Sequence, residues 1–161
     1  MNEPSDLYAT RDPNNTDILH EYFVPVARIG EFVEKIRPIL LKHHPDLLNI
    51  TVRNVEPDHD TFMRYATEEV FGLVMLFSHP RDATADAAMR QLTVELIDAA
   101  LASGGRYYLP YRPHATLPQL ERAYPQAREF FMKKLRYDPD GLFQNEFFLN
   151  YGRPFLEGAA P

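Results

Sequence analysis

Residues 69–78 read EVFGLVMLFS, an almost continuous apolar run that decides how the chain folds. A run of this length and composition predicts a central strand that is buried on both faces. Residues 82–102 follow it with apolar side chains at helical spacing, and Ser103-Gly104-Gly105 provides a helix stop. A buried strand followed by an amphipathic helix is therefore the expected centre of the fold.

The segments before and after this strand and helix add further strands and a helix in a known order. Strands are predicted at residues 18–26, 47–55 and 106–111, and a helix at 32–44 that Pro38 should bend or shorten. The order strand, helix, strand, strand, helix, strand predicts an α+β ferredoxin-like split βαβ sandwich, an antiparallel sheet with helices on one face. Its first and third strands should be central. Further helices are expected at 117–123 and 124–136, capped by Thr116.

Length and composition indicate one domain. The 161 residues divide into an expected flexible arm or linker at 1–16, a domain at 17–152 and a flexible tail at 153–161. The net charge of −6 disfavours nucleic acid as a partner. The chain has no cysteine and no apolar run long enough for a membrane span, so we expect a cytoplasmic protein.

Polar and aromatic side chains gather at the end of the fourth expected strand. The segment YYLPYRPHAT brings together Tyr108, Tyr111, Arg112 and His114. Hydroxyls, a guanidinium and an imidazole at one strand end are typical of a pocket for a polar ligand beside an apolar body. Tyr and Arg are also the residues that protein interfaces favour, so a partner surface explains the cluster about as well.

Two other polar groups favour structural roles. His43 and His44 fall at a helix C-terminus, where cationic side chains are favourable. Asp58 and Asp60 lie in a turn beside Pro57, where Asp stabilises the bend. We therefore predict no metal site.

Four segments resemble the C-terminal, substrate-side half of FAD-linked oxidases of the vanillyl-alcohol oxidase class, which includes sugar-lactone and alditol oxidases. They are EYFVP (21–25), NITVRNVEPD (49–58), RYYLPYRPHAT (106–116) and YDPDGLFQNEF (137–147), and the similarity runs from about residue 17 to 152. In that family a separate domain binds FAD, and the C-terminal half lays its sheet over the isoalloxazine. The resemblance implies that this chain needs an FAD-binding domain as partner and is inactive alone.

The resemblance also implies roles for single residues. Arg53 matches a substrate-binding arginine and Ser78 a hydroxyl residue, whereas Thr51 stands where alditol oxidases carry a glutamate. Tyr108 and Tyr111 stand where a histidine and a lysine lie. Losing these charges favours a less hydrophilic alcohol or hydroxy-lactone over a polyol.

By the same resemblance, the reaction is hydride transfer from an alcohol C–H bond to the flavin, and the tail residue nearest the flavin is Asn145. Tyr111, Arg112 or His114 would hold or deprotonate the substrate hydroxyl. Of these, His114 has the reference pKa, near 6.5, that suits a general base.

The alternative is a free-standing α+β module without catalysis. An uncovered apolar sheet face favours self-association. In this reading the chain forms a homodimer through its open sheet face and buries the neighbourhood of Phe71, Leu73 and Met75.

Overall fold

The computed structural model describes residues 12–157 and confirms the α+β ferredoxin-like fold. Its antiparallel sheet has the strand order β2-β3-β1-β4, with the first and third strands in the centre as expected. The strands are β1 (Asn15–Pro25), β2 (Asp46–Val55), β3 (Val70–Pro80) and β4 (Arg106–Tyr107). In the register of the two central strands, Asn15 pairs with Pro80 and Pro25 with Val70.

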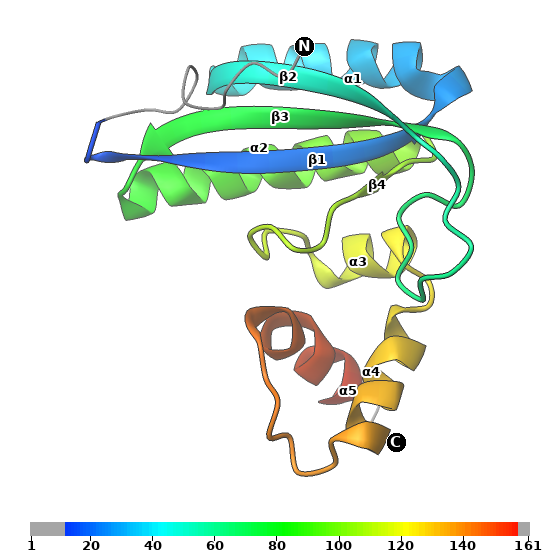
Figure 1. The fold of residues 1–161 in the computed structure, drawn as a ribbon. Helices are drawn as coiled ribbons and strands as arrows, with labels where there is room; N and C mark the ends of the chain where they lie inside the picture. The colour runs from blue at the N-terminus through cyan, green and yellow to red at the C-terminus, as the bar shows by residue number, and fades with distance from the viewer. Residues whose placement is uncertain (1–11, 158–161) are drawn as a thin grey trace.

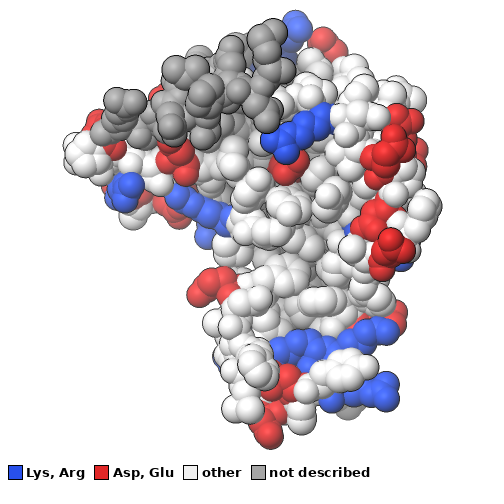
Figure 2. All heavy atoms as spheres, viewed as in Figure 1, with Lys and Arg blue, Asp and Glu red and all other residues white. Residues whose placement is uncertain are grey.

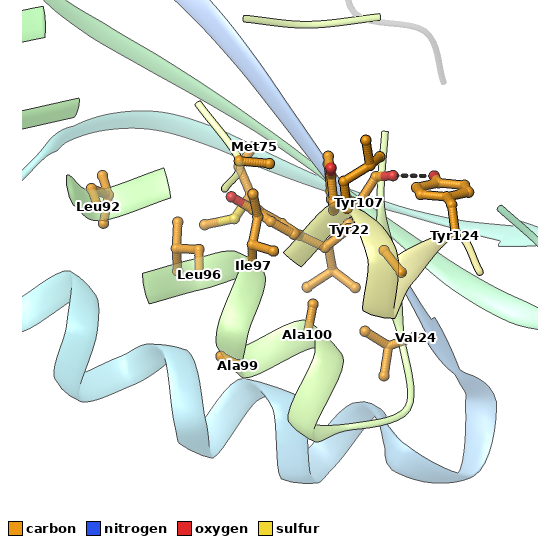
Figure 3. Packing of buried hydrophobic residues seen from close by; sticks show 14 of the residues in the cluster. Tyr22, Val24, Met75, Leu92, Leu96, Ile97, Ala99, Ala100, Tyr107 and Tyr124 are labelled. Carbon is orange, nitrogen blue, oxygen red and sulfur yellow. Dashed lines mark hydrogen bonds between the residues drawn. The ribbon is translucent and has the colours of Figure 1, made fainter. Parts of the chain in front are cut away.

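Two helices, α1 (Ile29–His43) and α2 (Ala83–Ala102), lie together behind the sheet (Figure 1). A short helical turn, Val26–Arg28, leads into α1. The Asp82 side chain caps α2 by accepting a hydrogen bond from the Ala85 amide at 2.8 Å. Alternation along the strands turns one set of residues towards these helices, namely Tyr22, Val24, Leu73, Met75 and Phe77, which pack on Leu92, Leu96 and Ile97 of α2 (Figure 3).

The opposite side of the sheet, called here the open face, is covered by residues 12–157 at one end only. There the loop between β2 and β3 packs Ala66 and Tyr65 against Phe23 and Val70. In Figure 2, which shows the molecule from this side, acidic side chains gather along the edge where this loop lies in Figure 1. The rest of the open face carries no helix of the described chain.

A C-terminal lobe lies below the sheet in the view of Figure 1. It contains α3 (Leu117–Ala123), α4 (Ala127–Tyr137), the π-helical turn Phe148–Gly152 and α5 (Arg153–Glu157). The predicted Thr116 cap is confirmed, because its hydroxyl and the Gln119 side chain form a reciprocal capping box. Tyr124 ties the lobe to the sheet by donating a hydrogen bond to the backbone carbonyl of Tyr107 (Figure 3).

Several boundaries differ from the expectation. The fourth strand stops at Tyr107 instead of residue 111, since Pro110 lacks the amide that would continue the ladder. Helix α1 runs through Pro38 to His43 without being shortened. Pairing in β1 already begins at Asn15, inside the expected arm, and residues 153–157 of the expected tail are helical. Residues 1–11 and 158–161 of these two segments lie outside the described part.

Candidate functional site

Four polar and aromatic side chains form a group on the open face that we call the open-face cluster: Glu21, Arg53, Tyr108 and Tyr111. Glu21 lies in β1 between the core residues His20 and Tyr22, so alternation turns it away from the helices. Arg53 lies in β2 opposite Gly72 of β3. Tyr108 follows β4, where its amide donates to the Glu21 carbonyl at 2.9 Å.

Gly72 makes room for this cluster. It lies in β3 between the strands that carry Glu21 and Arg53. A Cβ at this position would lie 3.2 Å from the Phe23 ring and 3.5 Å from Glu21 Oε1. Because glycine has no side chain, Glu21 can extend across β3 towards Arg53.

Burial and neighbouring charges shift the pKa values of both Glu21 and Tyr111. Partial burial raises the pKa of Glu21, while the Arg53 charge and a hydrogen bond from the Tyr111 hydroxyl act to lower it. Burial and the nearby Glu21 charge raise the pKa of Tyr111. The cluster therefore offers a carboxylate acceptor, a phenol donor and a guanidinium at one place on the sheet.

Aromatic rings form a wall beside these polar groups. Phe23 stacks on Tyr65 at 4.0 Å between ring centroids, and Tyr108 meets Tyr65 edge-on at 5.6 Å. Tyr108 also contacts Tyr111 at 5.2 Å, again edge-on. Both geometries are favourable for aromatic pairs, so the wall is well packed.

A cleft of about 590 Å³ opens next to Tyr111, between the loop after β4 and the C-terminal lobe. Its lining is mostly apolar, and comprises Met63, Leu109, Pro110, Tyr111, Pro113, Phe130, Asn145, Glu146 and Phe147. Asn145 is exposed at the cleft, where its side-chain oxygen accepts a hydrogen bond from the Phe148 amide at 2.9 Å. The structure thus places Asn145 and Tyr111 on the same cleft.

Arg112 and His114 line a small cavity together with Glu21, Tyr108 and Tyr111, but their hydrogen bonds run to α2 and to the end of β3. His114 is only 3% exposed, and its Nδ1 lies 3.1 Å from the Thr93 hydroxyl of α2. On the other side of this hydroxyl, at 3.3 Å, is Nε2 of the buried His20, whose Nδ1 meets the Tyr22 hydroxyl at 3.1 Å. These residues form what we call the histidine network.

The tautomers in this network follow from one hydrogen bond. The Thr93 hydroxyl donates its proton to the Met89 carbonyl at 2.7 Å, so it can only accept from the two imidazoles. His20 therefore carries its proton on Nε2 and His114 on Nδ1. The Tyr22 hydroxyl then donates to His20 Nδ1, so both ring nitrogens of His20 have a partner of the right kind.

His114 is consequently a weaker base than the sequence suggests. Burial, helped by the charges of Arg90 and Arg112, lowers the pKa of His114 to about 4. Burial likewise lowers the pKa of His20 to about 3. The expectation of an unperturbed imidazole base at His114 is wrong because α2 shields the ring from water.

Arg112 is held at the surface end of this network. Its guanidinium donates to Asp86 Oδ1 at 2.9 Å and to His79 Nε2 at 3.1 Å. His114 Nε2 lies 3.9 Å from the same Asp86 oxygen. These two hydrogen bonds of Arg112 reach α2 and the end of β3.

The other predicted site residues lie at different distances from Arg53. Thr51 is two residues along β2 on the same face and receives a hydrogen bond from Asn49 at 3.3 Å. Ser78 lies six positions beyond Gly72 on β3, about 20 Å away at the usual rise of a strand. Its buried hydroxyl accepts from Asn15 at 3.4 Å. The structure therefore does not bring Ser78 to the cluster.

Sequence reasoning missed Glu21 and Gly72. The available signal was a lone acidic residue inside the apolar run of β1 and a glycine inside the most apolar strand. Either residue alone indicates little. Only the pairing of β1, β3 and β2 shows that they belong to one site.

The polar groups read as structural in the sequence have local partners. His43 Nε2 lies 3.1 Å from Glu95 of α2, and His44 ends α1 in a left-handed conformation. Asp58 accepts hydrogen bonds from the amides of Asp60 and Thr61. Within residues 12–157, no cluster of three or more His, Asp or Glu side chains could hold a metal ion.

For a flavin, the described residues offer apolar and aromatic surface at the cleft and at the aromatic wall, but no diphosphate site at the N-terminus of α2. The N-terminus of α2 is already capped by Asp82 and carries Asp86 in its first turn, which disfavours a phosphate there.

Comparison with known protein families and with curated proteins found no match to this chain. Among the described residues, every helix is too short or too polar to cross a bilayer.

Proposed function

We propose that this chain is the substrate-binding part of an FAD-dependent oxidoreductase that oxidises an alcohol or hydroxy-lactone. An FAD-binding domain supplies the cofactor and most of its contacts. The observation that supports this proposal best is the open-face cluster, where Glu21, Arg53 and Tyr111 converge beside an apolar cleft. A carboxylate and a phenol can hold a hydroxyl, and a guanidinium can anchor its oxygen.

In this proposal each side chain of the cluster has one task. Tyr111 donates a hydrogen bond to the substrate hydroxyl, the Glu21 carboxylate receives its proton, and Arg53 stabilises the negative charge that develops on the oxygen. Tyr108 supports Tyr111 through their ring contact. When bound, the flavin supplies the hydride acceptor. His114 and Arg112 are positioning residues that do not touch the substrate, because their polar atoms bond to α2 and β3.

An exposed apolar loop supports the presence of a partner domain. Leu142 and Phe143 are 78% and 79% exposed. Their backbone amides are nevertheless fixed by the Asp138 carboxylate at 2.9 and 3.0 Å. A fixed loop that presents two large apolar side chains to water favours a surface that docks on another protein part.

The test is to express this chain together with the reading frame that precedes it and to measure bound flavin absorbance and alcohol-dependent dye reduction. We expect turnover, and a loss of at least about tenfold in kcat/KM for Arg53→Met. Arg37→Met on the surface of α1 is the control. Absence of flavin from the longer product would contradict the proposal, as would full turnover by the 161-residue chain alone.

The rival, a module that dimerises through the open face, keeps one supporting observation: Leu19 is 37% exposed there. The side chains expected in that interface do not lie on it, because Leu73 and Met75 are buried against the helices. Light scattering distinguishes the two. A stable dimer of the isolated chain that Leu19→Lys dissociates would favour the module.

A cytoplasmic location remains part of the proposal. The absence of cysteine from the sequence is its support.

A further inference from the structure

The apolar cleft and the open-face cluster share one residue. Tyr111 lines the cleft and also lines a small cavity of about 20 Å³ beside Glu21 and His114. That smaller space holds about one water molecule. Tyr111 thus borders both spaces, so a ligand bound in the cleft can place its polar end at Tyr111.

The lining of the cleft is strongly apolar. Leucine, proline, methionine and phenylalanine side chains make up most of its wall, and its only charged residue is Glu146. The Glu146 carboxylate already accepts a hydrogen bond from Asn150 at 3.0 Å. The lining holds no cation, and at its Tyr111 end the Arg53 charge is already offset by the Glu21 carboxylate, so an anionic ligand would lose hydration without gaining an uncompensated cation.

A polyol is disfavoured for a related reason. Each hydroxyl that enters an apolar space needs a hydrogen-bond partner in place of water. The side-chain oxygen of Asn145 is used by the Phe148 amide, which leaves few partners along the wall. A volume of about 590 Å³ is ample for an aromatic or branched apolar group, and such groups gain free energy on leaving water.

From this geometry we propose that the cleft binds the apolar body of an uncharged alcohol, with an aryl or alkyl group against Phe130 and Phe147 and its hydroxyl at Tyr111 and Glu21. This inference rests on the proposed function and names its substrate class. It assigns the loop after β4, α4 and the segment before Phe148 as the elements that select the substrate.

The test measures binding to the 161-residue chain itself, without flavin. A ¹⁵N-labelled sample is titrated with 3-phenylpropan-1-ol, with 3-phenylpropanoate and with xylitol. We expect saturable amide shifts with the alcohol at Leu109, Tyr111 and Phe147. The carboxylate should bind at least about tenfold more weakly, and xylitol should give no saturable shifts.

A matched pair of variants tests the place of binding. Met63→Trp fills the cleft and should weaken alcohol binding at least about tenfold, whereas Met132→Trp, on the exposed side of α4, should leave it unchanged. Pro110→Trp, on another wall, repeats the test should tryptophan at 63 disturb its loop.

Equal binding of the carboxylate or xylitol, shifts confined to other surfaces, or equal effects of Met63→Trp and Met132→Trp would overturn this inference. The flavin and turnover assay of the longer product would remain unaffected by such a result. Conversely, alcohol binding with no flavin in that product would remove the proposed function and keep the binding site.

Discussion

The open-face cluster and the histidine network differ sharply, although both draw on the segment 106–116. The cluster is half-exposed, contains glutamate and arginine charges, and has a cleft beside it. The network is buried, its two central histidines are neutral at pH 7, and its hydrogen bonds reach α2. Tyr111 and His114 are three residues apart and line one small cavity, yet Tyr111 bonds to Glu21 and His114 to Thr93 of α2.

The difference shows that residue type alone does not mark a catalytic group. Histidine at a strand end indicates a base, but here both imidazoles serve one threonine hydroxyl and stabilise the contact of sheet and helix. The group that can bind a ligand is the Glu21 carboxylate, which is less conspicuous in the sequence. The comparison therefore predicts stability effects in the network and binding effects in the cluster.

The largest expected effect is acid destabilisation by the network. The folded state keeps His20 and His114 neutral, with pKa values of about 3 and about 4, whereas the unfolded chain protonates them near pH 6.5. Because the unfolded state binds more protons, stability should fall as pH is lowered from 6.5 to about 4.5. The combined slope should approach about 2.7 kcal/mol per pH unit.

Urea denaturation across this pH range measures that slope. His114→Gln should reduce it by about half, since one of the two titrating groups is then gone. His59→Gln, in the exposed loop between β2 and β3, should leave the slope unchanged. A slope that is the same in all three proteins would show that the network does not control acid stability.

Next in size is removal of the hydroxyl that joins the two imidazoles. Thr93→Val leaves the N–H groups of His20 and His114 without an acceptor, so we expect a loss of about 2–4 kcal/mol in the free energy of unfolding. Thr67→Val at an exposed loop position should change it by less than about 0.5 kcal/mol. A loss for Thr93→Val as small as that of the control would contradict the assigned hydrogen bonds.

A smaller effect is expected at the cluster's glycine. Gly72→Ala brings a Cβ to 3.2 Å from the Phe23 ring, and should cost about 1–2 kcal/mol while displacing Glu21. Gly30→Ala in α1 meets no atom within 4 Å and should instead stabilise by up to about 1 kcal/mol. Thermal unfolding of the two variants measures whether each substitution stabilises or destabilises the protein. If both stabilised it, Gly72 would not be needed to leave space for Glu21.

The smallest stability change is expected for Arg53→Met, below about 0.5 kcal/mol, because Arg53 is exposed. Its effect should appear in the Glu21 carboxyl, whose pKa should rise further once the Arg53 charge is gone. Carboxyl NMR titration measures this shift, with Arg37→Met as control. If the pKa of Glu21 were unchanged in Arg53→Met, the two side chains would not interact and the proposed cluster would be wrong.

Local patterns predicted most of the elements correctly. The apolar run of β3, the helical spacing of α2 and the Thr116 cap each depend on neighbours in the chain, and each is confirmed. The strand order also followed, because a split βαβ pattern allows few sheet arrangements. Of the predicted site residues, Tyr108, Tyr111, Arg112 and His114 line one small cavity, whereas Ser78 lies six positions along β3 from Gly72.

The sequence by itself determined the four strands and the two covering helices, since alternation and helical period are local properties. Tertiary structure alone decided which polar residues meet. Cross-strand register put Arg53 opposite Gly72 and near Glu21, and helix α2 enclosed His114. Register and packing join residues far apart in the chain, and this information is absent from any short stretch of it.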